Sequence, residues 1–249
     1  MAFGRRRRST GISIRDLADY RTSDVNKEPF DGRSVNVDEA AKGLGVSKKA
    51  VRGVIASART ALSDRLLRRL TGRTEADTSQ AATARGMLQA AFGRGPRGGA
   101  VDTKAAAREL GVAPGTVRRW AAGTQQPSES RLAALRSAAR RSTTTKRGRQ
   151  ATIEEFRNSA AGKAALQGGT KVWVYGYQGA RRDGKTYSRD NRTIYRYVDG
   201  PSIEDLLQRY EEQGVDGFRD WLGDFGTSYM DGGEWEFTDI YDLGFGERQ

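Results

Sequence analysis

The sequence VDTKAAARELGVAPGTVRRWAAGTQQPSESRLAALRSAARR, residues 101–141, decides the predicted fold of this chain. Its apolar side chains recur at helical spacing on both sides of a short turn, Leu-Gly-Val at 110–112. Two short helices joined by such a turn, with a third helix from Ser128, form a helix-turn-helix whose second helix protrudes and fits a DNA major groove. We therefore predict a DNA-binding unit with a docking helix from Pro114 to Ala122.

A second copy of this pattern precedes the first, in NVDEAAKGLGVSKKAVRGVIAS at 36–57. When the chain is shifted by 66 positions, the Leu-Gly-Val turn at 44–46 falls on the turn at 110–112, and the alanines and Val-Arg pairs on either side also coincide. A period seen twice indicates a duplicated module. Ser47 is placed to cap the second helix of this copy. That helix is predicted to continue through 56–71, with its leucines inward and Arg59, Arg65, Arg68 and Arg69 outward.

Charge is unevenly distributed along the 249 residues. Residues 1–150 hold 31 Lys and Arg against 13 Asp and Glu, for a net +18, whereas residues 151–249 hold 12 against 18, for −6. A strongly basic segment favours a polyanionic partner. The front of the chain is therefore predicted to bind nucleic acid, and the rear to have another role.

Several classes of function are excluded by what the composition lacks. Without cysteine or histidine there are no disulfides, no Cys/His zinc sites and no histidine acid–base chemistry. No apolar run approaches the roughly 20 residues of a membrane span, and the basic start at 4–9 precedes a charged segment, unlike a secretory signal. Phosphate-loop patterns are absent too. We expect a cytoplasmic, nucleoid-associated, non-enzymatic protein with no cofactor, metal or membrane contact.

The expected fold class is α+β, with a mostly helical front of tandem helix-turn-helix units and a small α+β domain that contains a β-hairpin. The predicted organisation is a basic arm and short helix at 1–34, unit 1 at 35–75, unit 2 at 76–141, a polar basic linker at 142–151 and an acidic domain at 152–249. In the acidic domain a helix is expected at 152–166, then strands at 171–177 and 193–198 that flank a long basic loop, and helices from Pro201 and over 215–225.

Basic and polar residues that open the second helix of each unit are the candidate DNA contacts. An arginine can pair bidentately with guanine or rest on phosphate. The alternative for unit 2 is a helical hairpin packed against another domain. The N-terminal arginines are either a phosphate- or minor-groove-contacting arm or a solvated tail. The candidates are Lys48, Lys49 and Arg52 in unit 1, Gly115, Thr116, Arg118 and Arg119 in unit 2, and Arg5, Arg6, Arg7 and Arg8 in the arm.

Two features of the acidic domain leave alternatives open. Aromatic residues of the hairpin, with Arg181, Arg182 and Arg196 nearby, either form a surface that stacks unpaired bases or supply one buried and one ordinary sheet face. These aromatic residues are Trp173, Tyr175, Tyr177, Tyr195 and Tyr197. The carboxylates between Glu234 and Asp242 either hold a divalent metal or form an acidic surface, and the second interpretation is favoured because no metal-site spacing is present.

Unit 2 resembles the helix-turn-helix domains of the Cro/C1 (Xre-like) repressor family. The resemblance covers roughly 79–141 and rests on AARELGVAPGTVRRWAAG, on Pro127, and on the supporting leucines at 132 and 135. It implies that Gly115, Thr116, Arg118 and Arg119 touch DNA. The Ala-Pro-Gly entry at 113–115 departs from the polar residues common in that family.

The whole chain resembles the telomere terminal proteins of linear actinobacterial replicons, through SYMDGG…EFTDIYDL from Ser228 to Leu243. That resemblance implies binding of telomeric DNA, work with a telomere-associated protein and a DNA polymerase, and a hydroxyl that becomes joined to the DNA 5′ end. The implied candidates for this priming hydroxyl are Thr170, Thr186, Ser188 and Thr193. This chain is longer than the usual member of that family and carries an additional helix-turn-helix copy.

These observations lead to a specific expectation for function. We expect a sequence-specific double-stranded DNA-binding protein in replicon maintenance, able to form homo-oligomers. The alternative is a transcriptional repressor whose C-terminal domain dimerises or receives an effector. A metal-dependent nuclease that uses Asp239 or Asp242 ranks last, because no pair of residues has catalytic spacing.

Overall fold

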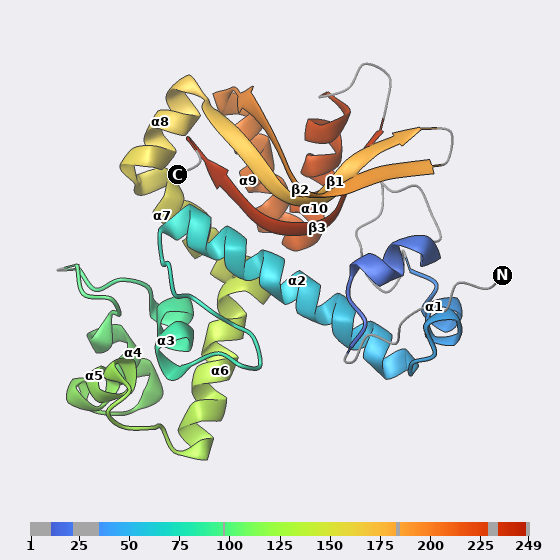
Figure 1. Ribbon diagram of the computed structural model, residues 1–249. Helices are drawn as coiled ribbons and strands as arrows, with labels where there is room; N and C mark the ends of the chain where they lie inside the picture. The colour runs from blue at the N-terminus through green and yellow to red at the C-terminus, as the bar shows by residue number, and fades with distance from the viewer. Residues whose placement is uncertain (1–10, 22–34, 97, 183–184, 229–233, 248–249) are drawn as a thin grey trace.

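The computed structural model describes residues 11–21, 35–96, 98–182, 185–228 and 234–247. It confirms the α+β class, with helices followed by one three-stranded antiparallel sheet (Figure 1). In chain order the elements are η1 (Arg15–Tyr20, a 3-10 helix), α1 (Val37–Leu44), α2 (Lys48–Thr71), α3 (Ala84–Phe92), α4 (Thr103–Leu110), α5 (Pro114–Ala122), α6 (Glu129–Thr144), α7 (Lys146–Asn158), α8 (Ala160–Gly168), β1 (Thr170–Arg182), β2 (Lys185–Val198), α9 (Gly200–Gln213), α10 (Val215–Thr227) and β3 (Glu234–Phe245).

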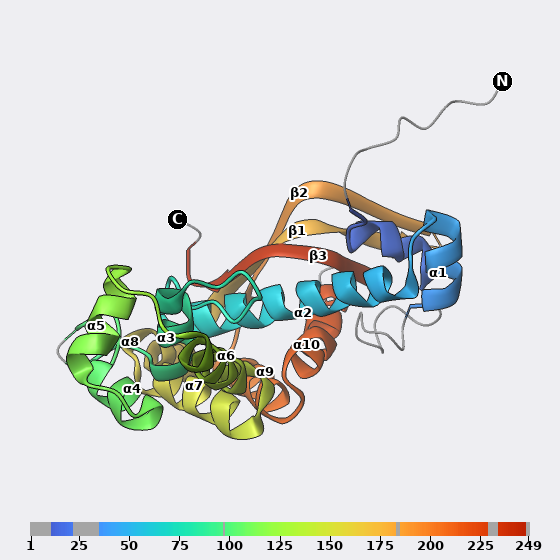
Figure 2. The same cartoon turned by 90° about the horizontal axis from the view of Figure 1, so that it is seen from below.

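Helix α2, which we call the spine, is the long helix that connects the other packed regions of the molecule. Its 24 residues span about 36 Å, from α1 at one end to the α3–α6 bundle at the other (Figure 2). It contributes to all three hydrophobic clusters of the described residues: Val51 packs with η1 and α1, Leu67 with unit 2, and Leu66 with the sheet domain. Because its apolar residues face several neighbours, the helix has no single apolar stripe.

Unit 1 is built from η1, α1 and the start of α2. Asn36 caps α1, Gly45 ends it in the left-handed conformation, and the side chain of Ser47 accepts a hydrogen bond from the Ala50 amide, as predicted for a cap. Gly43 lies directly beneath the Tyr20 ring, where a Cβ would stand only 2.2 Å from the tyrosine hydroxyl. Gly43 therefore lets η1 pack closely against α1, because a side chain at this position would collide with Tyr20.

Unit 2 has the predicted helix-turn-helix form. Asp102 caps α4, Gly111 turns the chain at φ 62°, and Pro114 opens α5. Val117 and Trp120 of α5 are buried in the cluster that joins α3, α4 and α6. The docking helix ends at Ala122, and Gly123 is its left-handed cap.

The prediction of an irregular linker at 142–151 is wrong, because all of these residues except Thr145 are helical. Helix α6 continues to Thr144 and α7 begins at Lys146. The buried Arg149 side chain donates to backbone carbonyls at the ends of two helices, at Thr144 in α6 and at Glu211 and Glu212 in α9. A guanidinium has enough donors for several such acceptors, so this basic stretch holds the two halves together.

Two further element predictions for the C-terminal domain are wrong. The single helix expected at 152–166 is two helices, α7 and α8, with a joint at Ser159, whose hydroxyl caps α8. The long basic loop of the hairpin is mostly strand, because β1 and β2 remain paired out to Arg182 and Lys185. Ladder hydrogen bonds join backbone groups, so a polar, charged sequence can continue the pairing past the apolar core.

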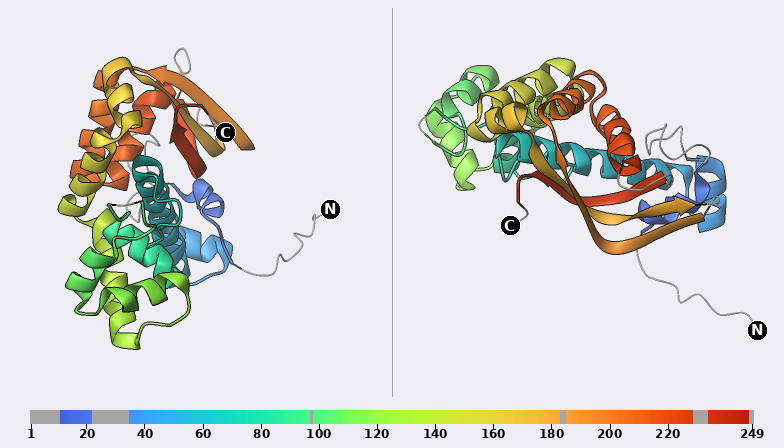
Figure 3. Two further views of the ribbon diagram at one scale, coloured as in Figure 1. Left: turned by 90° about the vertical axis from the view of Figure 1, so that its left-hand side faces the viewer. Right: turned by 90° about the horizontal axis from the view of Figure 1, so that it is seen from above.

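The sheet has the strand order β2-β1-β3, so β2 is an edge strand. One face packs on α9 and α10 and on residues of α2, α7 and α8, in the largest hydrophobic cluster (Figure 3). A register shift between Gly176 and Gln178 bends the hairpin. Among the described residues, no helix combines the length and apolar character that a bilayer crossing demands.

A buried carboxylate on α2 gives the fold a pH dependence. Asp64 is 3 % exposed and accepts hydrogen bonds from the Thr78 amide at 3.0 Å and from its hydroxyl at 2.8 Å. Burial outweighs these bonds and raises the pKa of Asp64 from 3.8 to about 6. The folded state therefore binds this proton more tightly than the unfolded chain does.

The Asp64 contribution to stability is expected to be fully present below pH 4 and to be lost as pH rises to about 6. The free energy of unfolding, relative to an Asp64→Asn variant that cannot titrate, should fall by about 2 kcal/mol between pH 4 and pH 7. Urea denaturation of both proteins at these pH values measures it. An unchanged difference would contradict the assignment.

Candidate nucleic-acid interface

Helix α5 presents the four predicted contacts of unit 2 on its exposed side. Arg118 and Arg119 are exposed and Gly115 and Thr116 are half-buried, while the opposite side of the helix lies in the core. The Ala113 side chain provides no hydrogen bond to cap the helix. Pro114 has no amide hydrogen and the Thr116 amide donates to the Ala113 carbonyl at 2.9 Å, so the Gly115 amide is the one of these first three positions that can reach a phosphate, the group that most protein–DNA hydrogen bonds contact.

The two arginines of α5 differ in how they are held. The Arg119 guanidinium donates from Nε to the Gln125 side chain at 2.8 Å and from Nη2 to the Thr116 hydroxyl at 3.2 Å. Arg118 makes no hydrogen bond or ion pair within the part of the chain that the structure describes. One arginine is therefore pre-oriented and the other is free to adapt. Gln125 was not predicted as a site residue. Its position two residues after Gly123, the cap of α5, could have indicated that its side chain lies close to this helix.

In unit 1, the predicted contacts lie at the start of α2 and are all exposed. Lys48 forms an ion pair with Asp38 of α1 at 2.9 Å, with both side chains more than half exposed. Lys49 and Arg52 make no ion pair among the described residues, so they carry the uncompensated charge of this surface. The predicted arm, Arg5 to Arg8, lies outside the described residues.

Of the four arginines predicted to point outward farther along α2, Arg69 is exposed as predicted, whereas Arg59, Arg65 and Arg68 are half-buried. Arg59 pairs with Asp216 of α10 through both nitrogens of its fork, and Arg69 pairs with Asp242 of β3. Burial lowers the pKa of Arg65, which lies near the same strand. These side chains join α2 to the acidic domain, so they are not available to DNA.

The acidic residues of β3 also form ion pairs with arginines from other parts of the chain. Glu236 pairs with Arg21 at 2.8 Å, and both side chains are less than a tenth exposed. Asp239 lies 3.5 Å from the Arg15 guanidinium. The sequence left two interpretations open for the carboxylates of this segment, a metal site and an acidic surface. In the structure Glu236 and Asp239 face arginines from the front of the chain. Within the described ranges, no group of three or more potential metal ligands comes together.

The candidate priming hydroxyls lie on strands, not on a loop. Thr170 begins β1, and Thr186, Ser188 and Thr193 belong to β2. The Ser188 hydroxyl oxygen is shielded from solvent and has no hydrogen-bond partner in the described structure, and Thr193 is half-buried. The side chain of Thr186 lies outside the described part. The expected basic loop that includes Thr186 and Ser188 is mostly strand, and the priming role of all four hydroxyls stays a prediction.

The hairpin aromatics divide between burial and exposure. Trp173 is 5 % exposed, and Tyr177 is half-buried with the Arg15 guanidinium 5.0 Å from its ring centroid. Tyr195 and Tyr197 are 61 % and 64 % exposed. Burial of Trp173 agrees with the interpretation of a packed sheet face, and a base-stacking role for the two exposed tyrosines stays a prediction.

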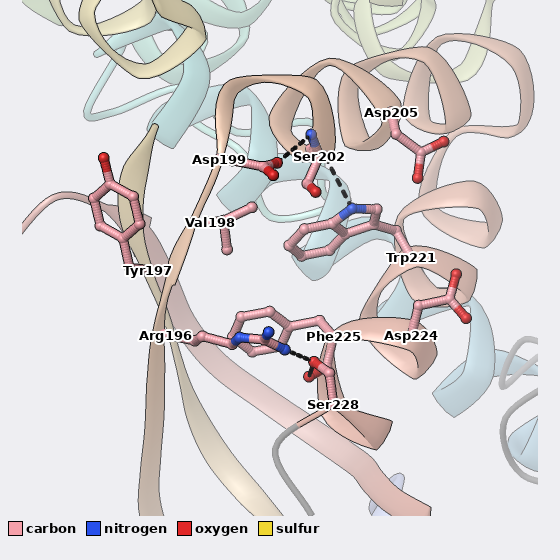
Figure 4. Close-up of a pocket in the computed structure, with 10 residues that line it drawn as sticks. All are labelled: Arg196, Tyr197, Val198, Asp199, Ser202, Asp205, Trp221, Asp224, Phe225 and Ser228. Atoms are coloured by element: carbon pink, nitrogen blue, oxygen red, sulfur yellow. Dashed lines mark hydrogen bonds between the residues drawn. The ribbon is translucent and has the colours of Figure 1, made fainter. Parts of the chain in front are cut away.

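A cavity of about 300 Å³ lies where β2 meets α9 and α10 (Figure 4). The Trp221 indole N–H donates to the Ser202 carbonyl at 3.1 Å, and Arg196 donates to the Ser228 hydroxyl across its mouth. Three carboxylates accompany this single arginine in the lining, so the cavity has the wrong sign for a nucleic-acid phosphate. They are Asp199, Asp205 and Asp224.

Comparison of the chain with protein-family models, with curated proteins and with solved structures finds no significant match.

Proposed function

We propose that this protein binds double-stranded DNA sequence-specifically, with α5 in the major groove. The observation that carries the proposal is α5 itself, a helix with Val117 and Trp120 in the core and Arg118 and Arg119 exposed. An exposed recognition helix that offers arginine forks is suited to guanine O6 and N7. The +18 charge of residues 1–150 adds affinity for phosphates.

Unit 1 is proposed as a second contact on the same duplex. The spine α2, about 36 Å long, begins in unit 1 and ends beside unit 2, and it is one uninterrupted helix. Successive major-groove sites on one side of DNA are about 34–36 Å apart. A rigid connection of this length supports simultaneous binding of both units by one chain.

Replacement of Lys49 and Arg52 by alanine is expected to weaken binding to all duplexes alike. Loss of two phosphate contacts should flatten the slope of log affinity against log salt by about 2. Fluorescence anisotropy over a salt series, on a preferred and a scrambled duplex, measures both effects. A control that removes the exposed charges of Arg147 and Lys163 should leave the slope unchanged. An unaltered slope in the Lys49/Arg52 variant would remove unit 1 from the interface.

We further propose that this binding serves replicon maintenance, with nucleoid association and with telomere-associated and polymerase partners. Its support is the resemblance of Ser228 to Leu243 to terminal proteins. Protein recovered from cells should then carry DNA that survives SDS and is released by protease. Recovery of DNA-free protein during replication would contradict it.

The strand positions of Thr170, Ser188 and Thr193 favour a second candidate, a transcriptional repressor that binds its operator reversibly. The repressor proposal expects the acidic domain to dimerise or to receive an effector. Under that proposal no adduct forms, and deletion of the gene raises transcription next to the bound sites. These opposite results separate the two uses.

A further inference from the structure

The β1–β2 hairpin is a basic element within an acidic domain. Residues 170–198 hold 7 Lys and Arg against 2 Asp and Glu, whereas the rest of 151–249 holds 5 against 16. The acidic residues of β3 and α10 are engaged by arginines of the front half, as at Glu236 and Asp216. The hairpin is therefore the part of this domain whose charge suits a polyanion.

Two tyrosines on the edge strand of the hairpin project from one face of the sheet. Tyr195 lies opposite Trp173, and Tyr197 lies opposite Lys171. Both tyrosines are on the face opposite to the one from which Val172, Val174 and Ile194 pack into the core. The Tyr197 hydroxyl donates to the Gly168 carbonyl, and the Lys171 ammonium is 4.6 Å from the Tyr195 ring centroid. The rings are thus held in place while more than half of each stays exposed.

The surface beside these rings is hollowed. A shallow depression of about 600 Å³ is lined by Thr170, Lys171 and the two tyrosines, with Gly169 and Gly246 among its walls. The lysine supplies a cation within the depression, and its partner Glu247 is itself 82 % exposed and displaceable. Aromatic faces, a cation and room beside them are the components of a surface that stacks bases.

We propose that this face binds single-stranded nucleic acid, with unpaired bases stacked on Tyr195 and Tyr197 and the backbone near Lys171. Side chains two residues apart on a strand are about 7 Å apart, which leaves room for one base at each ring. A duplex does not offer base faces, because its bases are stacked on one another. The activity therefore goes beyond the binding proposed for α5, and it uses different residues.

Fluorescence anisotropy of the full chain with labelled single strands of about 12 nucleotides, in DNA and RNA arms, tests the proposal. Replacement of Tyr195 and Tyr197 by alanine should weaken binding at least tenfold, since stacking on each ring contributes about 1–3 kcal/mol. The double phenylalanine variant keeps both ring faces and should bind nearly as well as the original. Binding in one arm alone identifies the strand as DNA or RNA.

Tyr187 provides the matched control. It is 55 % exposed and lies on the same strand, but it is paired with Ala180, which packs toward the helix-covered face. Tyr187→Ala should leave single-strand affinity unchanged. The proposal is overturned if the original protein binds neither strand, or if the Tyr195/Tyr197 alanine variant binds as tightly as the original. Repeating the assay in an Arg118→Ala/Arg119→Ala background separates its failure from failure of duplex binding.

Discussion

Replacement of Arg118 and Arg119 together by alanine is expected to weaken specific duplex binding by about 100-fold or more, because each bidentate arginine–guanine pair contributes about 1–3 kcal/mol. Both side chains are exposed on a helix whose other face holds the core, so the fold should survive. A preferred site selected from random duplexes, followed by anisotropy titration at fixed salt, measures the loss.

A charge-preserving pair of substitutions distinguishes base recognition from attraction to phosphate. Arg118→Lys/Arg119→Lys keeps both charges but removes the planar fork, so specific affinity should fall while affinity for scrambled duplex is retained. Arg140 and Arg147, exposed on α6 and α7, serve as the alanine control. If the double alanine variant still selects the same site with the original affinity, α5 is not the recognition helix.

Arg149→Ala is expected to lower the free energy of unfolding by about 2–3 kcal/mol, because it removes a buried guanidinium whose hydrogen bonds hold three backbone carbonyls at helix ends. Three of these bonds are 2.9–3.1 Å long, from Nε to Glu211, from Nη1 to Thr144 and from Nη2 to Glu212. They bind the end of α6, which supports unit 2, to the end of α9. Loss of this arginine should therefore loosen unit 2 from the C-terminal domain as well.

Arg147 is the control for this prediction, since it lies on the same helix with the same charge but is exposed. Arg147→Ala should change the unfolding free energy by less than about 0.5 kcal/mol. Urea denaturation followed by circular dichroism measures both. Equal stability of the Arg149→Ala protein and the original would show that water or neighbouring groups satisfy the carbonyls.

The acidic half of the chain acquires a physical role from these contacts. Asp216 and Asp242 neutralise arginines of the spine, and Glu236 neutralises Arg21. Buried pairs such as Arg21–Glu236 cost desolvation and fix the arrangement of the partners more than they add stability. Part of the −10 charge of residues 201–249 therefore pairs with the basic half, and part pairs within the C-terminal domain, where Arg209 binds three aspartates.

Local sequence by itself determined the helix-turn-helix form of unit 2. Helix spacing and the turn at Gly111 act within a few residues, so α4 and α5 and the exposure of Arg118 and Arg119 were predicted correctly. The same local rules placed the Ser47 cap of α2. Apolar periodicity also predicted the C-terminal helix over 215–225, which the structure extends to Thr227.

Only the tertiary structure decided which charged residues remain exposed. Arg69 and Asp242 are 173 positions apart, and Arg149 meets Glu211 across 62 positions. From sequence alone, each of these charged side chains is expected to be solvated, because no residue nearby in the chain offers it an ion-pair or hydrogen-bond partner. Pairing depends on where the sheet docks along α2, and that is set by leucines that face different neighbours. That long-range packing also decides three other features: the path of α2, the helices at 142–151 and the exposure of the β2 tyrosines. Local sequence periodicity cannot predict them, because it reports only on neighbours along the chain.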